Sequence, residues 1–143
     1  MLKIAIGNDH RGYALKNALV EKYKSQFEFV DCGTNDTTST DFPIYAQRVS
    51  KKILDKEADF GVLICSSGIG ISIAANRNKG IRAALCFNST MAKLTRQHNN
   101  ANILCMGADY IGQSLAYDMF ETFFATENLT EDKYLRRNKM LDD

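Results

Sequence analysis

The stretch Phe60-Gly61-Val62-Leu63-Ile64-Cys65-Ser66-Ser67-Gly68-Ile69-Gly70 decides the fold of this chain. Its first half is a short apolar run that ends in small and polar residues, which predicts a buried strand over residues 60–65. A helical pattern follows over residues 68–78. A buried strand that passes through a glycine-containing turn into a helix is the repeating unit of a parallel α/β sheet.

The same alternation extends over the rest of the chain. Strands are predicted over residues 2–7, 27–32, 60–65, 82–86 and 102–106. Helices are predicted over residues 15–23, 44–54, 68–78, 89–98 and 115–124, with a last helix from Thr130. The pattern predicts a three-layer α/β/α sandwich, Rossmann-like, with a five-stranded parallel sheet and a C-terminal helix. No linker or repeat interrupts it, so we expect a single domain over residues 1–143.

Composition excludes several classes of protein. A chain of 143 residues buries enough surface to fold without disulfides or a structural metal. The net charge of +1 gives no electrostatic case for binding nucleic acid or an anionic membrane. No apolar run approaches the ~20 residues of a membrane span. The four cysteines lack the spacing of zinc sites or C-x-x-C motifs, so we expect reduced thiols and a cytoplasmic location.

Two polar segments directly follow predicted strands. Asp9 and His10 come after the first strand, and Cys65 with Ser66 and Ser67 comes after the third. Ligands of open parallel sheets bind outside the carboxyl ends of the strands. If the first and third strands are neighbours, these segments face each other across a crevice.

Cys65 has the clearest chemical potential of the four thiols. It lies just before a predicted helix start, which favours a larger thiolate fraction and makes it a candidate base or nucleophile. The backbone N–H groups of the glycine-containing loop suit an anion or a developing oxyanion. The alternative is a small buried residue followed by a tight turn. Ile73 replaces the third glycine of a dinucleotide-binding motif, and Ile71 excludes a Cys-x5-Arg phosphatase motif.

Other candidates each have a structural alternative. Asp9 and His10 suit binding of a ligand hydroxyl and proton transfer, although Asp9 also suits a helix cap. His98 precedes the fifth strand, on the opposite edge of the sheet, and roughly 17–20 Å separates the two edges. It is therefore either structural or brought to the crevice by a neighbouring chain. Lys133 and Arg137 share a helix face and suit a phosphate clamp or an ordinary charged surface.

These residues together resemble a known family. The chain is similar to the type B ribose-5-phosphate isomerases, within the family that includes the galactose-6-phosphate isomerase subunits. The segments that carry the resemblance are residues 4–10, 31–34, 41–43, 65–76, 80–83 and 96–99. The resemblance implies interconversion of ribose 5-phosphate and ribulose 5-phosphate through an enediolate, in the non-oxidative branch of the pentose phosphate pathway. It also implies no metal or cofactor, and a homodimer or tetramer with shared active sites.

The resemblance assigns roles residue by residue. Cys65 is the base that moves a proton between C2 and C1, and Ser67 lies beside the reacting carbons. His98 is the acid/base that opens the furanose ring, with Asp9 as its partner. The implied substrate-binding residues are Asp9, His10, Ser66, Ser67, Gly68, Ile69, Gly70, Asn99, Lys133 and Arg137.

Three departures affect phosphate binding. Lys133 stands where the family usually has Arg, Tyr134 replaces the usual His, and Asp109 stands where many members have Arg. We expect Asp109 to point away from phosphate or to contact a hydroxyl. The alternatives are a hexose-6-phosphate isomerase acting on allose or galactose 6-phosphate, and a non-catalytic flavodoxin-like binding module.

Overall fold

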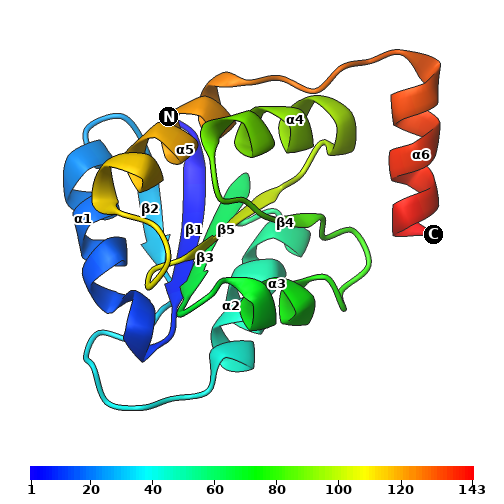
Figure 1. Ribbon diagram of the computed structural model, residues 1–143. Coiled ribbons are helices and arrows are strands. Elements are labelled where there is room, and N and C mark those ends of the chain that lie inside the picture. Colours follow the sequence, from blue (N-terminus) through cyan, green and yellow to red (C-terminus); the bar gives the residue numbers. More distant parts are fainter.

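The structure, a computed structural model, describes all 143 residues and contains one five-stranded sheet (Figure 1). Its strands are β1 (Lys3–Asn8), β2 (Glu28–Asp31), β3 (Phe60–Cys65), β4 (Ala83–Leu85) and β5 (Ile103–Gly107). Its helices are α1 (Tyr13–Tyr23), α2 (Phe42–Leu54), α3 (Ile69–Ala75), α4 (Ser89–Asn99), α5 (Gln113–Ala125) and α6 (Asp132–Asp142), with a 3₁₀ helix η1 (His10–Gly12). The strand order is β2-β1-β3-β5-β4, and every pair is parallel.

The predicted α/β/α architecture is confirmed, and β3 has the predicted bounds. The helix predicted over residues 68–78 is shorter, because α3 ends at Ala75. The Asn76 side chain donates to the Ala83 carbonyl at 2.9 Å and accepts from the Ala83 N–H at 2.8 Å. This local pairing with the start of β4 takes the chain out of the helix, an interaction that helical periodicity does not reveal.

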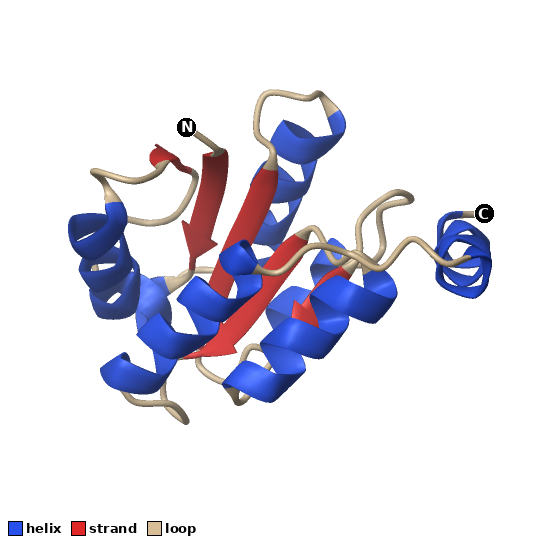
Figure 2. Cartoon of the chain, turned by 90° about the horizontal axis from the view of Figure 1, so that it is seen from above, coloured by secondary structure: helices blue, strands red, loops and turns tan.

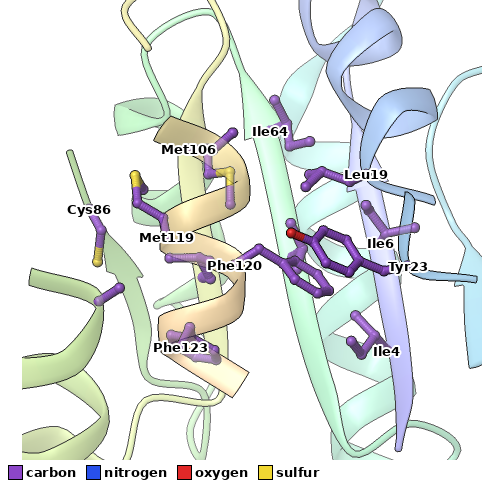
Figure 3. Close-up of a cluster of buried hydrophobic side chains, with 14 of the residues drawn as sticks. Ile4, Ile6, Leu19, Tyr23, Ile64, Cys86, Met106, Met119, Phe120 and Phe123 are labelled. Carbon is purple, nitrogen blue, oxygen red and sulfur yellow. The ribbon is translucent and has the colours of Figure 1, made fainter. Parts of the chain in front are cut away.

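Helices cover both faces of the sheet (Figure 2). On one face α1, α4 and α5 enclose an aromatic core, in which the rings of Tyr23 and Phe120 stack with centroids 4.3 Å apart (Figure 3). On the other face, α2 and α3 pack against the sheet. Val49 of α2, Leu63 of β3 and Ile71 of α3 are fully buried between them. None of the helices has the length and apolar character that crossing a membrane requires.

Helix α6 stands apart from these layers at the end of a long connection (Figures 1 and 2). The connection is fastened to α4, since the Leu129 N–H donates to the Gln97 carbonyl at 2.9 Å. Helix α6 itself packs against α4. The last helix therefore contacts α4 but belongs to neither of the two layers that cover the sheet.

The chain changes direction between β1 and β3. Asn8 pairs with Ile64, and just beyond that pair the Asp9 N–H donates to the Ile64 carbonyl at 3.2 Å. The residues that follow β1 and β3 are therefore neighbours at the carboxyl edge, which meets the condition under which the two polar segments face each other. This is the switch point at which doubly wound sheets bind ligands.

The close approach of η1 to β3 depends on Gly12. A Cβ atom built there would lie 2.8 Å from both the carbonyl oxygen and the Cγ2 atom of Ile64. Only a residue without a side chain lets η1 rest on β3 at this distance, so Gly12 fixes the place of Asp9 and His10.

We predict that Gly12→Ala lowers the free energy of unfolding by about 1–3 kcal/mol, because a new methyl group displaces η1 from β3. Gly112→Ala is the matched control, since a Cβ atom there meets nothing within 4 Å; its expected change is less than about 0.5 kcal/mol. Urea unfolding of both variants measures the difference. Equal midpoints for the two variants would contradict this account of Gly12.

Candidate active site

Cys65 is the last residue of β3 and lies at the switch point. Its sulfur accepts a hydrogen bond from the Gly68 N–H at 3.2 Å, and the residue is 5% exposed. Gly68 has a φ of 79°, in the left-handed region, and this conformation turns its N–H back toward the sulfur. The donor faces the atom on which a thiolate charge would reside.

The loop between β3 and α3 offers further donors. The Ile69 N–H donates to the Ser67 Oγ at 3.1 Å, which leaves the Ser67 hydroxyl proton free for another acceptor. The N–H groups of Ser66, Ser67 and Gly70 donate to no group of the chain. In the segment predicted to bind an oxyanion, residues 66–70, the N–H groups of Gly68 and Ile69 are thus used within the loop. The other three N–H groups remain available for a ligand.

Asp9 and His10 lie beside Cys65 on the neighbouring strand end. Asp9 is 6% exposed, and its Oδ1 accepts from the Arg11 N–H at 2.9 Å, so it caps η1. The His10 Nδ1 accepts from the Thr40 N–H at 3.2 Å. A neutral His10 ring therefore carries its proton on Nε2, which is the nitrogen left to donate to a ligand.

A buried lysine organises the loop that carries Thr40. Lys16 is 1% exposed, and its ammonium donates to the Thr34 carbonyl at 2.8 Å and the Asn35 Oδ1 at 2.6 Å. It also pairs with Asp31 at 3.1 Å. Sequence reasoning missed Lys16, because a lysine within an amphipathic helix is ordinarily exposed and nothing in the local pattern signals its burial.

Asp109 contacts a hydroxyl of the chain itself. Its Oδ2 accepts from the Ser66 Oγ at 2.6 Å and from the Arg11 guanidinium at 2.7 and 3.0 Å. The Ser66 hydrogen bond, followed by the hydrogen bonds and charge of Arg11, lowers the pKa of Asp109. Arg11 neutralises Asp109 and was not singled out from the sequence, because the two residues lie 98 positions apart.

The remaining predicted residues form a second group at the opposite edge. His98 and Asn99 are the last two residues of α4. The His98 ring stacks on Tyr134 of α6, the helix that carries Lys133 and Arg137. The structure brings together the members of each group but not the two groups. The six residues of β3 separate the two edges by roughly 17–20 Å.

Other features of the chain give no competing site. No group of three or more His, Cys, Asp or Glu side chains is placed to hold a metal ion. A cleft of about 490 Å³ is lined by Cys32, Arg48 and Lys52, away from the switch point. The candidate site is thus a sulfur atom with adjacent free N–H donors, and it lies at the carboxyl edge, where open α/β sheets bind ligands.

Comparison with known protein families also identifies an enzyme family. The family model described as ribose/galactose isomerase matches residues 4–141. The chain belongs to this ribose/galactose isomerase family.

Individual relatives are similar over most of their length. The chain is 44% identical to ribose-5-phosphate isomerase B of Escherichia coli over 117 residues, which cover 81% of this chain and 78% of that protein. A ribose 5-phosphate isomerase structure from Thermotoga maritima superposes with a TM-score of 0.95 at 44% identity, covering 99% of this chain and 97% of the other. The structure of the type B ribose 5-phosphate isomerase of Trypanosoma brucei superposes with a TM-score of 0.95 at 39% identity, covering 99% of this chain and 97% of the other.

The four thiols differ in their surroundings, and this predicts selective alkylation. Burial raises the pKa of Cys32, raises that of Cys86 to about 11, and raises that of Cys105 well above its ordinary value. Only the Cys65 sulfur accepts a backbone N–H. We expect limited iodoacetamide treatment at neutral pH to modify Cys65 first, as measured by peptide mass spectrometry. Modification of Cys86 or Cys105 at an equal rate would contradict this.

Proposed function

We propose that this chain interconverts ribose 5-phosphate and ribulose 5-phosphate, with Cys65 as the base. The observation that carries the proposal is the Cys65 sulfur at the switch point, which faces the Gly68 N–H and adjoins a loop with free donors. The relatives in Escherichia coli, Thermotoga maritima and Trypanosoma brucei are named as enzymes of this activity. We place the reaction in the cytoplasm, within the pentose phosphate pathway, which suits four unpaired cysteines.

The isomerisation needs a base and an oxyanion site. The Cys65 thiolate takes the proton from C2, the C1–C2 double bond forms, and the negative charge moves to O1. The free N–H groups of Ser66, Ser67 and Gly70 stabilise that charge. The thiol returns its proton to C1 while a proton passes from the O2 hydroxyl to O1, a transfer for which the free hydroxyl of Ser67 is suited.

Ribose 5-phosphate must first open its furanose ring. Opening breaks the C1–O4 bond, delivers a proton to O4 and removes one from the C1 hydroxyl. We assign these two proton transfers to His98 and Asp9. Because His98 lies at the opposite edge of the sheet in its own chain, a second chain supplies it, and the enzyme is a homodimer or a higher oligomer with shared sites.

The same second chain supplies the remaining substrate contacts. Asn99 adjoins His98 and is exposed, and Lys133 and Arg137 are exposed on α6. These cations hold the phosphate, while the His10 Nε2–H donates to a sugar hydroxyl. Asp109 is no obstacle to an anionic substrate, since Arg11 already neutralises it.

We predict that Cys65→Ala lowers kcat for ribose 5-phosphate by about 10²–10⁴-fold, because no other group at the switch point replaces the base. Cys32→Ala is the matched control, since Cys32 is a thiol that follows β2 at the same edge, and it should keep normal activity. Both variants and the parent are assayed with ribose 5-phosphate and allose 6-phosphate. Full activity of Cys65→Ala, or a parent that turns over only the hexose phosphate, would refute the proposal.

The shared site predicts complementation between inactive variants. Cys65→Ala and His98→Ala, mixed after partial unfolding and refolded together, form hybrid dimers in which one site has both wild-type residues. Random pairing of equal amounts restores about a quarter of parental activity. Each variant refolded alone is the control. Absence of recovery in hybrids that light scattering shows to be dimers counts against a shared site.

A further inference from the structure

Two residues of α6 hold His98 from different sides. The Tyr134 ring lies parallel to the His98 imidazole, with centroids 5.1 Å apart and an interplanar angle of 3°. The Asn138 Nδ2 donates to the His98 carbonyl at 3.1 Å. Tyr134 and Asn138 are four residues apart and therefore share one face of the helix. One face of α6 thus contacts both the side chain and the backbone of His98.

A third contact fixes the end of α6 to the same place. The Arg82 Nη1 binds the Asp142 carboxylate at 2.8 and 2.6 Å, and its Nε donates to the Asn99 carbonyl at 3.0 Å. The contacts of Tyr134, Asn138 and Arg82 all converge on the last two residues of α4.

Core packing does not explain this arrangement. The apolar side chains Leu135, Met140 and Leu141 of α6 are 47%, 69% and 65% exposed. Within its own chain, the helix thus leaves its larger apolar groups in solvent, while Asn138, at 9% exposure, is turned toward α4. The contacts that α6 makes with its chain are directed at His98 and its neighbour, which points to a role in orienting them.

The ring of Tyr134 restricts the orientation of the imidazole. An aromatic stack of this kind favours one side-chain orientation over its alternatives by about 2- to 10-fold. The Lys133 ammonium lies 5.0 Å from the centroid of the same ring. Tyr134 thereby links the cation assigned to the phosphate with the histidine assigned to the furanose ring.

We propose that Tyr134 is a positioning residue for ring opening. Its ring holds the His98 imidazole in the orientation that exchanges protons with the furanose, within the crevice of a second chain. This inference rests on the proposed function and deepens it. Tyr134 contributes nothing to the proton transfer by Cys65, which takes place on groups of the other chain.

The two stages of the reaction can be measured separately. Ribulose 5-phosphate forms no furanose, because its C5 oxygen carries the phosphate. Exchange of its C1 protons with D₂O, followed by proton NMR at saturating ketose, requires Cys65 and the oxyanion donors but no ring opening. Conversion of ribose 5-phosphate requires both stages.

We expect Tyr134→Ala to lower kcat for ribose 5-phosphate by about 3- to 10-fold, because loss of the stack removes the preference for one orientation of His98. We expect C1 exchange to remain within about twofold of the parent, since the base step does not involve His98. Tyr134→Phe keeps the ring and should restore conversion. Tyr134→Leu keeps the bulk without the stack and should behave as Tyr134→Ala does, which provides a second variant if the alanine variant does not fold.

A mixing experiment assigns the defect to the second chain. Hybrid dimers of Tyr134→Ala with Cys65→Ala contain one site with an intact Cys65 and an intact α6, and that site should convert ribose 5-phosphate at the parental rate.

Three results would overturn the inference. Parental conversion by both Tyr134→Ala and Tyr134→Leu would show that the stack has no role. An equal loss of C1 exchange and conversion would show a general structural role. A parent that neither exchanges nor converts either sugar phosphate would instead refute the proposed function, and the inference with it.

Discussion

The parallel pairing of β1 with β3 is the constraint on which the rest of the structure depends. It places Asn8 opposite Ile64 and allows the Asp9 N–H to reach the Ile64 carbonyl. Two strand ends that are more than 50 residues apart in the sequence thus become neighbours. Gly12 keeps this junction close by leaving no side chain between η1 and β3.

Local patterns predict the fold, and they propose one half of the candidate site. Apolar runs and helical spacing predict each strand and helix, and the carboxyl-edge rule then selects Asp9, His10 and Cys65. Contacts between side chains that are distant in sequence were not predictable. The Arg11–Asp109 pair depends on the order of the strands, and the Tyr134–His98 stack depends on the position of α6. Neither feature can be predicted from a short segment of the sequence. The burial of Lys16 was not predictable for a related reason. It results from the loop with Thr34 and Asn35, which contacts the Lys16 ammonium.

The residues of the candidate site are divided between the two edges of one sheet. The carboxyl edge has Cys65 and the free N–H donors, which lie at the end of β3, next to the end of β1. The amino edge has the histidine and the cations, built on α4 and α6 at its periphery. Each half has its own internal hydrogen bond, between the Gly68 N–H and Cys65 on one side and between Asn138 and the His98 carbonyl on the other.

The separation of α6 from the layered core has an evolutionary consequence. Substitutions on this helix change few contacts that hold the sheet together, so they cost little in folding. The residues at the end of β3 have no such freedom, because a side chain at Gly68 would meet Leu85 and Met106. A fold organised in this way can keep one reaction while it diverges in the sugar it recognises, and a family described by both ribose and galactose has the breadth that such a division permits.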